Sequence, residues 1–215
     1  MIFTRTADLV LRTALLLALM TVAAGLFFWG YWPHSDYRLR RNWTVAQTVP
    51  FSHQHHVAGL GIDCRFCHAA VEISAEAGMP PTHTCMTCHS QVWTRADLLA
   101  PVRRSQRDDK PLTWQRVTDL PDYVYFNHGI HVAKGVGCSS CHGDVGNMPL
   151  TYKAKPMTMQ FCLECHRDPG PQLRPRDELF NTRWHRAPDT PSPAQLLHEY
   201  QIGARQLTDC SICHR

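Results

Sequence analysis

The sequence lacks a strong charge of either sign. Its 22 Lys and Arg residues against 18 Asp and Glu leave a formal net charge of +4, and charged residues make up only 19% of the chain. An excess this small does not argue for a nucleic-acid partner, which usually meets a strongly basic face. The 44% share of apolar residues is ordinary for a folded chain and excludes low-complexity disorder. With 215 residues, the chain has room for one or two small domains but not for a large hydrolase-type core.

The chain has no isolated cysteine. All ten cysteines form C-x-x-C pairs, and a histidine directly follows every pair. The paired cysteines are Cys64 and Cys67, Cys85 and Cys88, Cys138 and Cys141, Cys162 and Cys165, and Cys210 and Cys213. The histidines that follow them are His68, His89, His142, His166 and His214. Histidine is 14 of 215 residues, so five successive matches by chance have odds on the order of one in a million.

The spacing C-x-x-C-H is the attachment signature of c-type haem. Two thiols add across the two vinyl groups, two intervening residues let one turn span them, and the next residue provides an axial imidazole. A zinc half-site or a thioredoxin-like redox pair would need the cysteines but not the histidine. The sequence therefore predicts five covalently bound haem c groups. Because covalent attachment takes place on the outer face of the cytoplasmic membrane, we expect the haem domain to be periplasmic.

Only one long apolar run is present, at residues 13–32, and it carries no charge. Twenty helical residues could cross a hydrocarbon core of about 30 Å. Trp29, Tyr31 and Trp32 lie at its end, as interfacial aromatic residues do. We therefore expect a single transmembrane helix at residues 13–32, after a cytoplasmic segment at residues 1–12. The alternative is a cleaved signal peptide, but the run is longer than a typical signal core.

The charges that flank this run do not favour the same orientation. Arg5 and Arg12 precede it, whereas Arg38, Arg40 and Arg41 follow it. The positive-inside rule alone would place the larger group in the cytoplasm. We give haem attachment more weight and expect residues 33–215 to form the periplasmic pentahaem domain of a protein anchored in the inner membrane.

The chain contains an internal repeat. The pattern F-x-H-x-x-H occurs at residues 51–56 and again at residues 126–131, each time followed by two C-x-x-C-H motifs. The histidines of the two copies are 75 residues apart, whereas the first cysteines are 74 apart, so one residue is missing from the second copy. We therefore expect repeat units at about 51–89 and 126–166, which is typical of a duplication, and a separate fifth haem segment at about 205–215.

The regions between the motifs are rich in proline. Residues 101–125 contain three prolines and residues 169–193 contain six. Because proline disfavours helix interiors, we expect extended crossings over the surface in both regions. Short helices are expected at about 84–92, 159–167 and 193–203, with little β-structure. The predicted fold class is a mostly α-helical and irregular multihaem cytochrome c, in which the haems supply much of the apolar core.

Each of five irons can take a second axial ligand. Two histidines three residues apart cannot both bind one iron, so each histidine of an F-x-H-x-x-H pattern should serve a different haem. This predicts His53, His56, His128 and His131 as distal ligands. The fifth distal ligand stays open: Met159 is included among the site residues, His83 and His185 are the other main candidates, and Met148 and Met157 follow. His34, His55 and His198 are not expected to bind iron.

The F-x-H-x-x-H and C-x-x-C-H pattern resembles that of small multihaem cytochromes of the cytochrome c3 type. A longer match, which includes sequence between the motifs, resembles the pentahaem cytochrome c subunit of alternative complex III. Its residues are 61–68, 78–82, 85–89, 110–117, 119–128, 134–138, Met159 before Cys162, and 210–215. The resemblance covers most of residues 50–215 and the N-terminal helix. Departures occur at His55, His83 and the region around Trp184 and His185.

This resemblance implies an electron-transfer subunit of a respiratory quinol:acceptor oxidoreductase, without a catalytic site of its own. An iron–sulfur subunit of the molybdopterin-enzyme type would feed it electrons, and integral membrane subunits would oxidise quinol. A cytochrome c or a terminal oxidase would be the acceptor. The alternative is a stand-alone, membrane-anchored multihaem quinol dehydrogenase. A multihaem reductase is less favoured because no C-x-x-C-K motif occurs and candidate distal ligands outnumber the irons.

Overall fold

The computed structural model describes residues 4–203 and 207–214, and the chain divides into two units, residues 1–41 and 42–215. Residues 205, 206 and 215 of the predicted fifth haem segment lie outside the described residues.

The first unit consists of the long helix α1 (Arg5–Tyr31), a 3-10 turn (Trp32–His34) and the short helix α2 (Asp36–Leu39). Helix α1 begins eight residues before the predicted run because the Thr4 side chain caps it and Arg12 forms an ion pair with Asp8 one turn away. None of its residues is buried within the protein. Of the helices described, only the stretch Arg5–Leu39 is long and apolar enough to cross a membrane.

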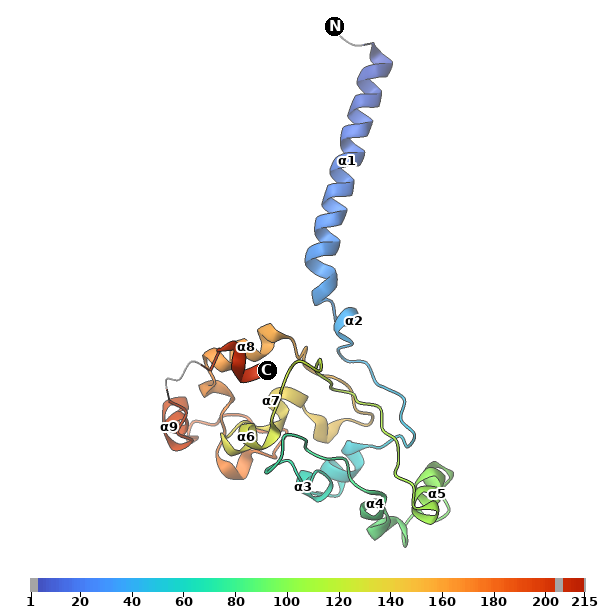
Figure 1. Ribbon diagram of the computed structural model, residues 1–215, viewed down its shortest axis with the longest axis vertical. Helices are drawn as coiled ribbons and strands as arrows, with labels where there is room; N and C mark the ends of the chain where they lie inside the picture. The colour runs from blue at the N-terminus through green and yellow to red at the C-terminus, as the bar shows by residue number, and fades with distance from the viewer. Residues whose placement is uncertain (1–3, 204–206, 215) are drawn as a thin grey trace. The chain divides into compact units, whose positions relative to one another are not determined.

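The second unit contains short helices joined by long irregular segments (Figure 1). Its α-helices are α3 (Cys64–Cys67), α4 (Thr82–His89), α5 (Ala100–Asp108), α6 (His128–Ala133), α7 (Cys138–His142), α8 (Met159–Arg167), α9 (Pro193–Glu199) and α10 (Cys210–Cys213). A π-helical turn covers Gln54–Gly59, and 3-10 turns cover Asp97–Leu99, Val145–Asn147, Gly170–Gln172 and Arg176–Glu178. In the part of the chain that the structure describes, β-structure is limited to isolated bridges at Thr44–Tyr152 and Val136–Leu173. The predicted mostly α-helical and irregular architecture is therefore confirmed.

The three predicted short helices are present, and two of them have shifted ends. Helix α8 has the predicted bounds, since Thr158 caps it by accepting a hydrogen bond from the Phe161 amide. Helix α4 begins two residues earlier than predicted and ends at His89. Helix α9 ends at Glu199, four residues before the predicted end.

The predicted extended crossings are wrong in two places. Residues 100–108 form α5, because Pro101 lies in the first helical turn, where a missing amide hydrogen costs no helical bond. Val102 and Ser105, three residues apart on α5, are buried. In the second region, Leu173 is fully buried and packs with Leu196 and Tyr200 instead of crossing the surface.

The apolar core of the second unit is small. The buried apolar residues that pack with one another form three separate clusters, centred on Val102, Val132 and Leu196. Many large apolar side chains outside them are exposed, including Phe66, Ile73 and Tyr123. The protein alone therefore provides little continuous core, as expected if bound haems supply most of it.

Candidate haem sites

Each C-x-x-C-H motif forms one helical turn. Three motifs are short helices of their own (α3, α7 and α10), and two lie within longer helices (α4 and α8). In the first motif the His68 amide donates to the Cys64 carbonyl at 2.9 Å, and in the last the His214 amide donates to the Cys210 carbonyl at 2.8 Å. None of the ten cysteines forms a disulfide, so each turn presents two sulfur atoms and one imidazole.

A hydrogen bond to a backbone carbonyl fixes Nδ1 in seven of the nine histidines predicted to bind iron. The bonds are His56–Ser52 (2.8 Å), His68–Gly78 (2.7 Å), His89–Val92 (3.2 Å), His128–Ala75 (2.7 Å), His131–Asn127 (2.7 Å), His166–Leu207 (2.7 Å) and His214–Tyr123 (3.1 Å). An Nδ1–H that donates to a carbonyl sets the ring orientation and leaves Nε2 available as the metal ligand.

The remaining two predicted histidines have other surroundings. The Nδ1 atom of His53 is hydrogen-bonded to Thr151 Oγ1 at 3.0 Å. Burial lowers the pKa of His142 to about 4, and burial followed by the neighbouring His68 lowers the pKa of His53 to about 4. Both rings are thus kept neutral, the form that binds a metal. In the described part of the chain, no ring hydrogen bond of this kind is made by His34, His55, His83, His185 or His198.

Three predicted distal histidines lie opposite a motif histidine. The ring centroids are 6.2 Å apart for His56 and His89, 6.4 Å for His128 and His142, and 6.1 Å for His131 and His166. Two imidazoles on opposite sides of one metal ion, at metal–nitrogen distances of about 2 Å, have centroids about 6 Å apart. The two rings of each pair are therefore as far apart as two axial ligands of one iron would be.

The fourth predicted distal histidine, His53, has His68 and His142 among its neighbours. Among charged neighbours, His68 has the largest effect on the pKa of His53, after burial. His128 and His131 lie opposite different motif histidines, His142 and His166.

The two F-x-H-x-x-H segments have the same ring arrangement. Phe51 stacks on His56 with centroids 4.4 Å apart and meets His53 edge-on at 5.0 Å. Phe126 stacks on His131 at 4.4 Å and meets His128 edge-on at 4.8 Å. The phenylalanine of each copy therefore holds both histidine rings in place.

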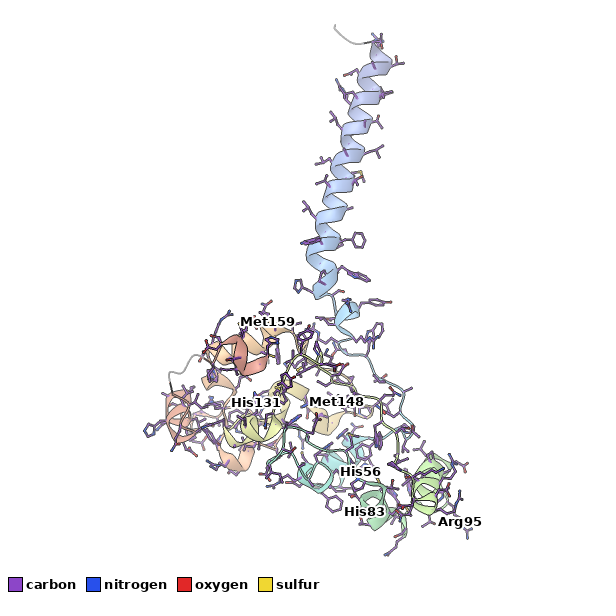
Figure 2. All side chains as sticks on the ribbon, in the orientation of Figure 1. His56, His83, Arg95, His131, Met148 and Met159 are labelled. Atoms are coloured by element: carbon purple, nitrogen blue, oxygen red, sulfur yellow. The ribbon has the colours of Figure 1, made fainter. Side chains whose placement is uncertain are left out.

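The candidates for the fifth distal ligand lie in different parts of the second unit. Met159 begins α8, and Cys213 of α10 is close enough to Cys162 of α8 to raise its pKa, after the larger effect of burial. Figure 2 shows Met159 in the region of α8 and α10, and His83 at the opposite end near α4 and α5. Met148 is buried, so its side chain is not presented at the surface. His185 is exposed. Met159 is thus the candidate that lies on the element next to α10.

The residues present fit covalently attached haem better than zinc. Across residues 4–203 and 207–214, no three His, Cys, Asp or Glu side chains come together as a metal cluster. The cysteine pairs therefore do not combine into four-ligand zinc sites. Separate thiol pairs, each with an adjacent imidazole, suit several haems, and the opposed second imidazole found at three of them suits bis-histidine ligation. The site defines a c-type cytochrome that carries several haems.

Comparison with known proteins supports this class. Residues 124–215 match the family model described as cytochrome c7 and related cytochrome c. The chain is also 30% identical over 169 residues to the menaquinone reductase multihaem cytochrome c subunit of Nitratidesulfovibrio vulgaris strain Hildenborough, a match that spans 67% of this chain and 77% of that protein. The chain therefore belongs to the family of cytochrome c7-like multihaem cytochromes c.

Sequence reasoning missed two residues of the haem region. Thr151 anchors His53 across 98 residues of chain, and Arg174 contacts Ser139 of the third motif across 35 residues. Neither residue belongs to a recognisable motif, so the sequence contains no signal that could have identified it.

Proposed function

We propose that the protein carries five haems c, one on each C-x-x-C-H turn. His53, His56, His128 and His131 would be the distal ligands of the first four, and Met159 that of the fifth. The observation that carries this proposal is the set of three imidazole pairs with centroids 6.1–6.4 Å apart. The backbone hydrogen bonds at Nδ1 hold these rings in the orientation that iron binding needs.

The haem count and the ligand assignment can be tested separately. The mass of the intact holoprotein should exceed that of the chain by five haems, and proteolysis should recover a haem on each motif peptide. His131→Ala should convert one low-spin haem to high-spin, as seen by visible and electron paramagnetic resonance spectra. His198→Ala, at an exposed histidine without a ring partner, is the matched control. An unchanged low-spin spectrum of the His131 variant would reject that ligand.

Met159 requires its own test, because an exposed methionine is often only a surface residue. Histidine–methionine ligation raises the haem potential relative to bis-histidine ligation. Met159→Ala should therefore remove the near-infrared sulfur–iron band and lower the potential of one haem. Met79→Ala, at an exposed methionine that is not a candidate ligand, is the control, and a band that persists in Met159→Ala would exclude Met159 as a ligand.

We further propose that this cytochrome is an electron-transfer subunit of a membrane-bound quinone oxidoreductase complex, with no catalytic site of its own. c-Type haems supply one-electron transfer when they are bound. The motif cysteines and the histidines of this chain would hold the haems, and α1 would anchor the second unit to the outer face of the inner membrane. The sequence resemblance in the segments between the motifs favours alternative complex III. An iron–sulfur subunit would then be the electron donor, membrane subunits would oxidise quinol, and a cytochrome c or terminal oxidase would be the acceptor.

The comparison favours a second candidate function, in which electrons flow in the opposite direction, since the relative is named as a subunit of menaquinone reductase. In that case electrons would pass from the haems towards quinone instead of away from quinol. The complex purified from native membranes distinguishes the two. Rapid haem reduction by a menaquinol analogue favours quinol oxidation, whereas quinone reduction driven by a reduced viologen dye favours the opposite direction.

Mass spectrometry of the co-purifying proteins tests the complex itself. An assembly with an iron–sulfur protein and several multispan subunits is the expected result. A chain that purifies alone and still oxidises quinol would instead support the stand-alone quinol dehydrogenase. The quinol site would then have to lie in this chain, beside the aromatic end of α1.

A further inference from the structure

Arg174 is a buried cation in the second unit. Its side chain is only 5% exposed, and it lies against the third haem motif. Nη2 donates to Ser139 Oγ at 2.5 Å, and Nη1 donates to the Asn181 carbonyl at 2.8 Å. A Cβ atom at Gly137 would lie 2.3 Å from Arg174 Nε, so the guanidinium is packed directly on the backbone that leads into Cys138.

No carboxylate neutralises this guanidinium at close range. Among the described residues, none of the six ion pairs includes Arg174, and its Nε is buried without a hydrogen-bond partner. The nearest opposing acid is Glu178, whose carboxylate accepts instead from Asn181 Nδ2 at 2.7 Å. Trp184 covers one face of the guanidinium, 5.0 Å from the ring centroid. Arginine keeps its charge in such surroundings, where ammonium groups often lose theirs.

A fixed charge in this position has a predictable effect on redox chemistry. Reduction adds one electron to iron and lowers its positive charge by one. A nearby cation therefore favours the reduced form, and it does so most strongly where protein replaces water and the local dielectric constant is low. Salt screens a buried charge far less than an exposed one.

We propose that Arg174 raises the reduction potential of the haem attached at Cys138 and Cys141, relative to the same site without the charge. This inference rests on the proposed attachment of a haem to that motif. Arg174 would act through its charge and not as an iron ligand. Its contacts with the motif are at Gly137 and Ser139, on the cysteine side of the turn.

The test is a spectroelectrochemical titration of the holoprotein, with the haem on the 138–142 peptide verified by mass spectrometry. Arg174→Gln should move one component to lower potential, and Arg174→Lys should move it less. Ser139→Asp offers a second route, because it gives the guanidinium a carboxylate partner and keeps the arginine in place. It too should lower one component, whereas Ser139→Asn should not. This pair keeps the proposal testable if Arg174→Gln fails to fold.

Arg186→Gln is the matched charge control. Arg186 lies over Trp184 at 5.4 Å but is exposed to solvent, so its removal should leave the potentials nearly unchanged. Unchanged potentials in both Arg174→Gln and Ser139→Asp, or an equal shift in Arg186→Gln, would overturn the proposal. A 138–142 peptide without haem would instead reject the proposed haem site, and the two failures are thus distinguishable.

Discussion

The two repeats, at residues 51–89 and 126–166, hold their histidines in the same way but close the following turn differently. In both, phenylalanine stacks on the second histidine at 4.4 Å. In the first copy the His56 carbonyl accepts from the Ile62 amide, six residues on. In the second, the His131 carbonyl accepts from the Val136 amide, five residues on. Ile62 and Val136 each stand two residues before the first cysteine of the next motif.

The extra residue of the first copy is thus absorbed between the histidines and the haem-binding turn. The first copy forms a π-helical turn at Gln54–Gly59, whereas the second forms the α-helix α6. A π turn accommodates one more residue per turn than an α-helix, and such turns are frequent at functional sites. The placement of the phenylalanine and histidine rings is therefore the same in both copies, whereas the backbone between these rings and the cysteines differs.

The copies also differ in burial. Gly129 and Val132 of α6 are buried, whereas no residue of the π turn is. The Gly129 amide donates to the Ser74 carbonyl at 2.9 Å, so the second copy packs against a loop of the first. Changes at equivalent positions should therefore be more harmful in the second copy than in the first.

The largest difference is expected for loss of a haem attachment site. Burial raises the pKa of Cys138 and Cys141 to about 11 and about 12, whereas Cys88 is exposed. Cys138→Ala/Cys141→Ala should leave no folded holoprotein, because the small core cannot compensate for a haem lost beside the more buried thiols. Cys85→Ala/Cys88→Ala should still fold and retain four haems. Size-exclusion chromatography and intact mass check this, and equal yields of both variants would contradict it.

The next contrast concerns a glycine of positive φ in each copy. Gly61 has φ +68° with open space around it, whereas Gly135 has φ +81° and a Cβ there would meet the buried Tyr200 ring at 2.2 Å. Alanine costs about 1–2 kcal/mol at either position for the left-handed backbone. Gly135→Ala should cost a further 1–3 kcal/mol or so for overpacking. Thermal unfolding of the two holoproteins measures this, and equal destabilisation would show that Tyr200 moves aside freely.

A smaller contrast is expected at Gly129 and its equivalent, Gln54. A Cβ at Gly129 would lie 3.1–3.2 Å from the backbone of Glu72, Ile73 and Ser74, which cannot rotate away as a side chain could. Gly129→Ala should therefore destabilise the protein by about 1–2 kcal/mol, partly offset by the better helix propensity of alanine. Gln54 is exposed, so Gln54→Ala should change stability by less than about 0.5 kcal/mol. Denaturant titration would contradict the comparison if Gly129→Ala were neutral.

The sequence was most informative where chemistry demands a fixed local pattern. The C-x-x-C-H spacing predicted a short turn at each of the five motifs, and residues 159–167 matched α8 to the residue, because the Thr158 cap defines its start. The F-x-H-x-x-H repeat predicted equivalent histidine arrangements. These features depend on neighbours within a few residues, which sequence spacing records directly.

Contacts between distant segments were beyond sequence reasoning. The proline-rich region 169–193 was expected at the surface, but the fully buried Leu173 packs with Leu196. Proline content reports the local backbone and not burial against a distant helix. The same holds for Arg174, whose partner Ser139 lies 35 residues away. A buried arginine beside a haem motif looks, in the sequence, like any surface arginine.

The smallest expected effect is that of replacing the phenylalanine of each copy, and it should be nearly the same in both copies. Phe51 and Phe126 make the same two ring contacts, so removing either ring should have nearly equal consequences. Phe51→Leu and Phe126→Leu keep an apolar side chain and lose about 0.5–1.5 kcal/mol of aromatic pairing each. Both should loosen the second histidine of their copy, seen as a small change in the low-spin signal of one haem. A much larger loss for Phe126→Leu would mean that the burial of α6, and not the ring stack, holds His131 in place.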